Sequence, residues 1–342
     1  MIGVEVCEVV CLKTNDAGRP NPFSFPSSLM TQNQTTIEVI QGDLTAYRQG
    51  NTGIDYVHRF ESGKPGPHVL VNALTHGNEI CGMVAVKQLL DIGVRPKIGT
   101  LTLSFAHVEA YDAFDSAQPF ENRQITHNLN RVWSDEMLDS PQDSAELRRA
   151  RALRPVVAAA DHLLDIHSTS QDVVPFWVYP AFERNASVAL AIGLPSVHLV
   201  MPNGLGSGTP MIQHGAFAGA HAPGAALVAE CGQHFKQATA DIATEVAMRF
   251  IAHFGLIDAL PVTTPRAPQR RFELLETHVI KADTFHFVRP LIGFETFAMG
   301  ELIAVNGPEE VRSPCDDCTI FMPARAAIVG REAVYLTRPL QD

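Results

Sequence analysis

Residues 68–90 read HVLVNALTHGNEICGMVAVKQLL, and this stretch decides the fold. Residues 68–74 form a short apolar run, which is typical of a buried strand. A helical pattern follows from Glu79 to about Leu90 and stops before Gly93 and Pro96. The stretch therefore predicts a strand, a tight turn and a helix in direct succession.

The same alternation continues toward the C-terminus. Apolar runs predict further strands at 100–107, 162–167, 176–182, 196–200 and 225–232, and helical patterns predict helices at 144–160 and 236–254. Strands that alternate with helices predict an α/β fold, with a mixed, mostly parallel sheet flanked by helices on both faces.

Changes in composition divide the chain into three parts. The first residues contain several prolines in a Ser- and Asn-rich stretch, which predicts an N-terminal arm over 1–36. After the Pro-rich segment 260–270, short apolar runs separated by Gly, Pro and Asp replace the alternation. We therefore expect the α/β domain to cover 37–264 and a smaller all-β domain to cover 265–342.

The overall charge excludes several classes of partner. The chain has 342 residues, 46% of them hydrophobic, and a formal net charge of -11. A chain of this charge has no general attraction for nucleic acid or for an anionic membrane, so an anionic substrate needs individual arginines. The N-terminus has no basic region before an apolar stretch, and no apolar run reaches about 18 residues. We expect a soluble, cytoplasmic protein, and self-association remains open.

The six cysteines are too few for a disulfide scaffold. Cys315 and Cys318 form a CxxC pair, which is either half of a zinc ribbon or a turn with two ordinary thiols. The sequence contains no second CxxC to complete a ribbon, and the role of the pair stays open.

Polar residues at the ends of predicted strands carry metal-ligand chemistry. His76 and Glu79 lie three residues apart in THGNE, and His167 ends the strand that leads into DIHSTS. Two histidines and one glutamate with an open fourth position are the ligand set of a catalytic zinc site. Asp165 is a candidate to orient the His167 imidazole.

A further strand end supplies a candidate acid and base. Glu230 follows an apolar run, where burial of a carboxylate is otherwise costly. A carboxylate beside a catalytic metal can take a proton from the attacking water and pass it to a leaving nitrogen. Arg123, Asn130 and Arg131 stand out in ENRQITHNLNRVW, because guanidinium groups bind carboxylates and developing oxyanions.

Each of these signals has a plain structural alternative. A lone HxxE also occurs on helix surfaces, and a histidine at a strand end is often a hydrogen-bonded core residue, which is how we interpret His107 and His198. The ordered set of HxxE, an NxNR-like segment, a strand-end DxH and a strand-end Glu is what favours a catalytic zinc site. The Gly-rich segment 203–220 lacks a phosphate-binding pattern and is better interpreted as a loop over the site.

At these residues the sequence resembles the succinylglutamate desuccinylase/aspartoacylase family, which is related to the zinc carboxypeptidases. The resemblance covers about residues 65–335 and depends on His76-Gly77-Asn78-Glu79, Leu129-Asn130-Arg131, Asp165-Ile166-His167 and Glu230. It implies a zinc-carboxypeptidase-like fold in which the small C-terminal β domain narrows the channel to the site. It further implies one Zn²⁺ on His76, Glu79 and His167, catalysis by Glu230 and Arg123, and a substrate carboxylate on Asn130 and Arg131.

The sequence departs from the aspartoacylase-like members in two places. Those members have a further Arg shortly before the catalytic Glu, where this chain has GAFAGAHAPGAALVA. They also have a late Tyr, where the matching stretch here is MPARAAIV, with Arg325 as a residue that the sequence does not place. We therefore expect a substrate with fewer negative charges than N-acetylaspartate.

The sequence predicts a zinc-dependent amidohydrolase that cuts the amide bond of a small N-acyl amino acid and releases a carboxylate and a free amine. The alternatives are a metallocarboxypeptidase, which shares the ligands but needs an open cleft, and a non-catalytic zinc-binding regulatory protein. The sequence does not indicate the acyl group, the amino acid or the pathway.

Overall fold

The computed structural model describes residues 36–260 and 267–340. The predicted arm lies almost entirely outside the described residues, and so does the predicted boundary at 264/265, so both stay predictions. The described residues from Ile37 onward form one compact unit by their contacts. None of the helices in the two described ranges is long and apolar enough to cross a membrane.

A large mixed sheet forms the centre of this unit. Among the described residues it has 11 strands in the order β1-β3-β2-β4-β7-β5-β6-β8-β14-β13-β10. Pairing is parallel from β3 through β2 and β4 to β7 and again from β5 through β6 to β8, whereas β1/β3 and β5/β7 are antiparallel. The strands of its α/β part are β1 (Val57–Glu61), β2 (His68–Ala73), β3 (Thr100–Phe105), β4 (His162–Thr169), β5 (Phe176–Pro180), β6 (Val197–Met201) and β7 (Ala226–Gln233).

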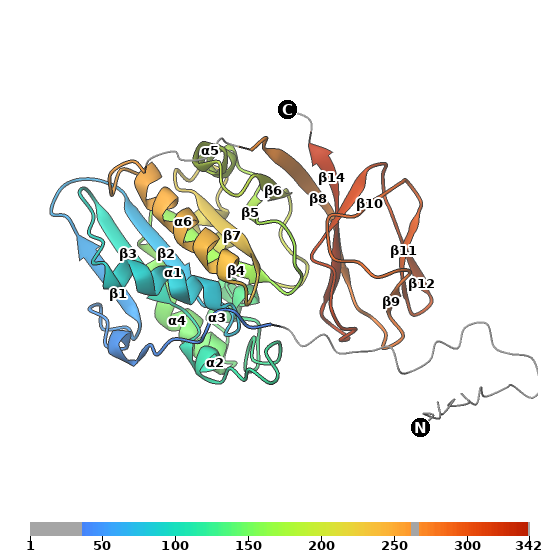
Figure 1. Cartoon of the computed structure of the whole chain (residues 1–342), viewed down its shortest axis with the longest axis horizontal. Coiled ribbons are helices and arrows are strands. Elements are labelled where there is room, and N and C mark those ends of the chain that lie inside the picture. The colour runs from blue at the N-terminus through green and yellow to red at the C-terminus, as the bar shows by residue number, and fades with distance from the viewer. Residues whose placement is uncertain (1–35, 261–266, 341–342) are drawn as a thin grey trace, which may run out of the picture. The chain divides into compact units, whose positions relative to one another are not determined.

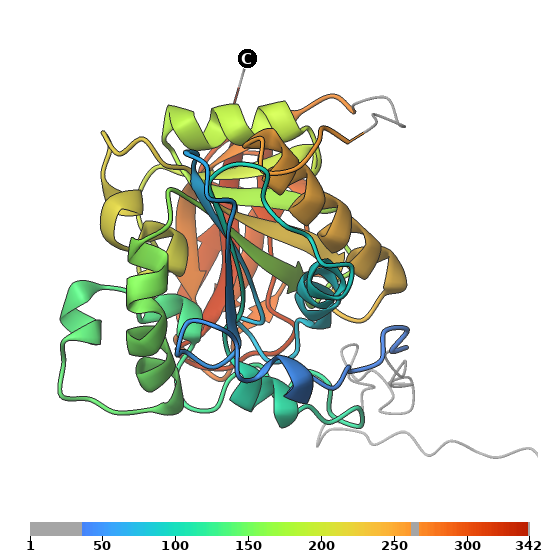
Figure 2. The same ribbon diagram turned by 90° about the vertical axis from the view of Figure 1, so that its left-hand side faces the viewer.

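Helices cover both faces of this sheet. Helices α1 (Ile80–Asp91), α5 (Glu183–Ile192) and α6 (Gln237–His253) share one buried apolar cluster, and α4 (Ala145–Ala158) belongs to a second cluster. Figure 1 shows α1 and α6 lying together across the strands, and Figure 2 shows the sheet between α4 on one side and α1 and α6 on the other. Successive residues of one strand enter different clusters, such as Val69 and Leu70 of β2. Burial of both strand faces explains why these strands are apolar runs in the sequence.

The C-terminal part is all β, as the sequence predicts. Strands β8 (Arg270–Val279), β10 (Thr296–Phe297), β13 (Cys318–Phe321) and β14 (Glu332–Leu340) extend the central sheet, because β8 pairs in parallel with β6. A separate three-stranded sheet is made of β9 (His286–Phe287), β11 (Leu302–Asn306) and β12 (Glu309–Arg312). The two sheets share one apolar cluster, which includes Ile303, Ile320 and Leu336. In Figure 1 these strands lie beyond β8, on the side away from the helices of the α/β part.

The remaining helical elements are short. They are α2 (Val108–Asp112), α3 (Asp135–Leu138), and the 3₁₀ turns η1 (Thr45–Tyr47), η2 (Leu129–Arg131), η3 (Met211–Gln213) and η4 (Gly215–Ala218). Turn η2 carries two of the residues singled out in the sequence, Asn130 and Arg131. The segments around η2 and η3 face each other, since Val132 and Thr209 form a parallel bridge.

The predicted fold class is confirmed, but strand β1, helix α5 and the short helices α2 and α3 were not predicted. Strand β1 reads VHRFE and is a half-exposed, antiparallel edge, so it lacks the apolar run of the inner strands. Helix α5 begins after Phe182, whose side chain makes no capping hydrogen bond. The edge strand lacks the apolar run that marked the inner strands. The missing cap does not distinguish α5, because α1 and α6 also begin without a side-chain cap and were predicted.

Candidate metal centre and active site

The turn after β2 places two candidate ligands. Leu74 is fully buried with a φ of 59°, an unfavourable conformation for leucine that turns the chain sharply before His76. Gly77 admits no side chain, because a Cβ there would lie 2.5 Å from the Asn122 carbonyl oxygen. Its N–H donates to the Arg123 carbonyl oxygen at 3.0 Å. The turn thereby fixes His76, Glu79 and the Arg123 backbone together.

His76, Glu79 and His167 form one buried cluster. Their candidate ligand atoms all lie within 4.8 Å of one another, and each residue is at most 2% exposed. The Glu79 carboxylate lies between the two rings, with Oε1 2.8 Å from His76 Nδ1 and Oε2 2.9 Å from His167 Nδ1. The structure thus brings together the three residues that the sequence singles out as zinc ligands.

The outer ring nitrogens are held by other groups. His167 Nε2 lies 2.7 Å from Asp165 Oδ2, and His76 Nε2 lies 2.9 Å from Asn128 Oδ1. A proton on each Nε2 leaves both Nδ1 atoms to act as ligands, which is the arrangement that metal-binding histidines need. Asp165 Oδ1 in turn accepts hydrogen bonds from Asn72 and Thr75, both at 2.8 Å.

Electrostatics at the cluster favour a cation. Burial, reinforced by Arg123, lowers the pKa of His76 to about 4, so its imidazole is neutral near pH 7 as ligation requires. Burial would raise the pKa of Glu79, but His76 and His167 hold it well below its usual value. Burial opposes the charge on His167, yet Asp165 and Glu79 raise its pKa well above normal. A bound cation would replace the proton that His167 shares with Glu79. Two imidazoles, one carboxylate and supported outer nitrogens fit a zinc-type ion.

Glu230 lies beside this cluster. Strands β4 and β7 are adjacent, and their register pairs His167 directly with Glu230. Burial raises the pKa of Glu230 to about 8. Among the described residues, its Oε2 atom has no hydrogen-bond partner. A buried carboxyl group with a free oxygen can accept and return a proton near neutral pH.

Arg123 reaches the cluster from the loop before η2. Its Nη1 donates to Glu79 Oε1 at 2.7 Å, and its side chain is 32% exposed. One edge of the guanidinium therefore contacts a candidate metal ligand, while the rest lines the cavity in front of the cluster.

Asn130 and Arg131 contact the protein itself. Asn130 Oδ1 accepts the Met211 N–H at 3.0 Å, and Arg131 forms an ion pair with Glu332 at 2.8 Å. Both line the cavity. Tyr335 lies next to them and donates to Glu332 at 2.6 Å. The expected late tyrosine is absent from the stretch 322–329, and Tyr335 of β14 lines the cavity instead.

The cavity has a volume of about 90 Å³ and is lined by both parts of the unit. The α/β part supplies His76, Arg123, His167 and Glu230, among others. The C-terminal part supplies Met322, Glu332 and Tyr335.

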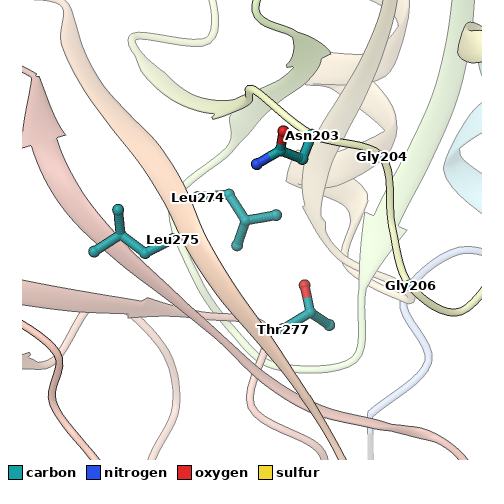
Figure 3. Close-up of a pocket in the computed structure, with 6 residues that line it drawn as sticks. All are labelled: Asn203, Gly204, Gly206, Leu274, Leu275 and Thr277. Carbon is teal, nitrogen blue, oxygen red and sulfur yellow. The ribbon is translucent and has the colours of Figure 1, made fainter.

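A second hollow lies between residues 203–206 and β8. Figure 3 shows its lining, which consists of Asn203, Gly204, Gly206, Leu274, Leu275 and Thr277. None of these side chains is ionisable, so this hollow offers no acid–base or metal chemistry.

Sequence reasoning missed three residues of the site. Asn128 stands in the polar segment that drew attention, but its contact with His76 was not predicted. Glu332 and Tyr335 lie on β14, far along the chain from the motifs. Arg325, which the sequence did not place, stacks on Phe120 with its guanidinium carbon 3.8 Å from the ring centre, and it is exposed. The expected interpretation of His107 as a packed, hydrogen-bonded residue is confirmed by its 3.0 Å contact with Glu146.

Comparisons with known structures agree with this fold. The sequence comparison with curated proteins found no match. The succinylglutamate desuccinylase from Vibrio cholerae has a similar structure, with a TM-score of 0.63 and 19% identity over 84% of this chain and 86% of that chain. A succinylglutamate desuccinylase/aspartoacylase from Rhodobacter sphaeroides gives 0.59 and 16% over 84% and 90%, and an aspartoacylase family protein from Mesorhizobium loti gives 0.57 and 18% over 86% and 93%. These likenesses support the fold.

The family comparison goes further. The family model described as Succinylglutamate desuccinylase/Aspartoacylase catalytic domain matches residues 65–253, which is more than half of the chain. The matched range contains the cluster of His76, Glu79 and His167 together with Glu230. The chain belongs to the succinylglutamate desuccinylase/aspartoacylase family.

Proposed function

We propose that this protein is a zinc-dependent amidohydrolase that cuts the amide bond of a small N-acyl amino acid. The observation that carries the proposal is the buried cluster of His76, Glu79 and His167. Glu230 is paired with His167 on the neighbouring strand of the sheet. Membership of a deacylase family supports the same reaction type.

His76, Glu79 and His167 are the proposed ligands of one Zn²⁺. When bound, zinc supplies Lewis acidity that polarises a carbonyl group and lowers the pKa of water. Asp165 and Asn128 orient the two imidazoles through their outer nitrogens. This support keeps the ligand atoms in place and raises the basicity of His167.

Glu230 is the proposed general base and acid. It takes a proton from the attacking water as the water oxygen bonds to the amide carbon. It then delivers that proton to the amide nitrogen as the carbon–nitrogen bond breaks, so water and amide become a carboxylic acid and an amine. The second water proton then passes from the acid to the amine, which leaves a carboxylate and an ammonium group. Burial raises the pKa of Glu230, which helps it to hold the proton between these steps, and a bound cation nearby would favour the ionised form that takes the proton first.

Arg123 is the proposed partner of the carbonyl oxygen. Only one edge of its guanidinium contacts Glu79, so further N–H groups can stabilise the negative charge that develops on this oxygen. Substitution of such a donor typically costs about a hundredfold to a thousandfold in kcat.

The alternative of a metallocarboxypeptidase requires an open cleft. The C-terminal residues Met322, Glu332 and Tyr335 line the cavity in front of the cluster, which leaves room for a small substrate. This lining favours N-acyl amino acids over peptides, and a parallel assay with short peptides separates the two activities.

A Glu230→Gln variant tests the proposal. We expect it to bind zinc as the unaltered protein does, measured by elemental analysis, and to lose about three orders of magnitude in kcat for released amine. Full turnover in this variant would remove Glu230 from the mechanism. Bound zinc without hydrolysis of any N-acyl amino acid by the unaltered protein would support a non-catalytic, zinc-binding regulatory protein.

A further inference from the structure

We propose that His234 is a positioning residue of the metal centre, which acts through Ser168 on the Glu79 carboxylate. This inference rests on the proposed function, since it takes Glu79 as a metal ligand. It concerns the affinity of the site for the ion rather than the reaction, and His234 is not among the residues that the sequence motifs single out.

Among the described residues, two groups outside the candidate ligand set hold the Glu79 carboxylate. Glu79 is 1% exposed, and its contacts with His76 and His167 only join candidate ligands to one another. From outside this set, Arg123 Nη1 donates to Oε1 at 2.7 Å, and the Ser168 N–H donates to Oε2 at 3.2 Å. Such outer donors keep the oxygen atoms of a carboxylate ligand in place. The Ser168 peptide therefore takes part directly in shaping the site.

The side chain of Ser168 is bound in turn by His234. Ser168 Oγ lies 2.8 Å from His234 Nδ1, and the two residues are 4% and 3% exposed. Ser168 directly follows His167 on β4, so its N–H extends from one candidate ligand to another. A buried hydrogen bond on the hydroxyl restrains the backbone of the same residue, and with it the direction of this N–H.

The backbone around His234 brings its ring to this position. The pairing of β4 with β7 shifts register between His167 and Thr169. The shift includes Gly232 of β7, whose φ of 122° is readily adopted only by glycine. The His234 N–H then donates to the Thr169 carbonyl oxygen at 2.9 Å. His234 is thus fixed by its backbone and by its ring, directly after the strand that carries Glu230.

Aromatic rings surround the contact between His234 and Ser168. The centre of the His234 ring lies 6.1 Å from that of Phe120 and 5.5 Å from that of Phe235, and Arg325 stacks on Phe120. Burial lowers the pKa of His234 to about 3, so its imidazole is neutral near pH 7. A neutral ring can hold the Ser168 hydroxyl without a positive charge that would repel a nearby cation.

Zinc affinity of the full-length protein, measured by competition with a chelator, tests the inference. His234→Phe keeps an aromatic ring and removes Nδ1, and we expect its Kd for Zn²⁺ to rise about tenfold or more, as is typical when a group that orients a ligand is lost. His234→Asn keeps an amide near the place of Nδ1, so we expect its Kd to stay within about threefold of that of the unaltered protein. An unchanged Kd in His234→Phe, or equal losses in both variants, would overturn the inference.

His198→Phe is the matched control. His198 is also buried with its Nδ1 2.8 Å from a hydroxyl, that of Tyr179, but it belongs neither to the metal cluster nor to the cavity lining. His198→Phe and His234→Phe each lose one buried hydrogen bond, so both metal-free proteins should unfold at a lower temperature. Only His234→Phe should bind Zn²⁺ more weakly. A weaker affinity in both variants would mean that lost packing explains the effect, and the inference would be wrong.

Ser168→Ala tests the same contact from its other end. It removes the hydroxyl and keeps the N–H that donates to Glu79. We expect the same rise in Kd as in His234→Phe, and no further rise in the double variant, because one shared contact is lost in all three proteins. Additive losses would show that the two side chains act separately and would contradict the inference. If His234→Phe does not fold, Ser168→Ala decides alone, since an unchanged Kd in this variant refutes the inference.

These measurements separate the inference from the proposed function, because zinc affinity does not depend on turnover. If no N-acyl amino acid is hydrolysed, the proposed function fails, and the Kd values of the variants still decide the role of His234. If an N-acyl amino acid is hydrolysed and every variant binds Zn²⁺ as tightly as the unaltered protein, the inference fails and the proposed function stands.

Discussion

The metal cluster of His76, Glu79 and His167 and the cavity wall, formed by residues 205–212 and the C-terminal part, are built in different ways. His76 and Glu79 come from one turn, and His167 comes from the next strand of the sheet, so two short motifs define the cluster. The wall depends on Arg131, Ser207 and Glu332, which belong to three distant segments. The carboxyl ends of neighbouring parallel strands meet at one edge, so their residues converge without long-range contacts. The wall instead requires the C-terminal strands to be in place.

This difference leads to different expectations for mutations. A change in the metal cluster should reduce turnover of every substrate to a similar degree, because all substrates need the same chemistry. A change in the wall should alter the preference between substrates and leave zinc binding intact.

The largest effect is expected from His167→Ala. This variant should lose bound zinc and at least about a thousandfold in kcat/KM for every N-acyl substrate, because a catalytic ligand is gone. Elemental analysis and amine release measure the two effects. His286→Ala is the matched control, because His286 is an exposed histidine of β9 and should keep zinc and turnover. If kcat/KM fell by unequal factors for different substrates, the proposed difference between the metal cluster and the cavity wall would be wrong.

The segment from Arg123 to η2 connects the metal cluster to the cavity wall, and Glu146 holds part of it in place. Its Oε1 accepts hydrogen bonds from the Ile125 and Thr126 N–H groups at 2.7 and 3.0 Å, and His107 Nε2 lies 3.0 Å away. Burial opposes its charge, but these hydrogen bonds lower its pKa to about 2. Glu146 thus helps to order the segment that leads from Arg123 to η2.

Glu146 should make stability depend on pH. Its folded-state pKa of about 2 lies below the usual value of 4.5 for a glutamate, so its contribution is complete above pH 4.5 and is lost as pH falls toward 2. The shift corresponds to about 3 kcal/mol at neutral pH. Urea unfolding of the protein and of Glu146→Gln should differ by about this amount at pH 7 and by much less near pH 3. A difference that does not change with pH would contradict the proposed ionic role of Glu146.

The sequence was sufficient for the inner strands because each is buried on both faces and forms an apolar run. Val69 and Leu70 show this, since they are adjacent in β2 and belong to different clusters. It was sufficient to single out the clustered residues His76, Glu79 and His167, because HxxE and DxH place them at the ends of such strands. The edge strand β1 has only one buried face, so it is not an apolar run and was not predicted.

The contacts of the cavity wall could not be predicted from the sequence, for a different reason. Arg131 was recognised, but a lone arginine does not reveal its partner. Glu332 is 201 residues away along the chain, in a strand whose pattern predicts only that it is β structure. The pairing of Arg131 with Glu332 could therefore be recognised only once the two side chains were seen together.

The smallest effect is expected from Tyr335→Phe. This change removes the hydroxyl that donates to Glu332 Oε2 at 2.6 Å and accepts from Arg131 Nη2 at 3.3 Å, and it keeps the ring beside the cavity. Three hydrogen bonds between Arg131 and Glu332 remain, so the cavity wall should stay in place. We expect the free energy of unfolding to fall by about 2 kcal/mol, on the scale of hydrogen bonds to charged groups. Values of kcat/KM for N-acyl amino acids should change by less than about threefold, since less than about 1 kcal/mol would be lost at the transition state. A loss of about tenfold or more with unchanged stability would mean that the Tyr335 hydroxyl contacts the substrate, and the cavity wall would then recognise a polar group of the substrate.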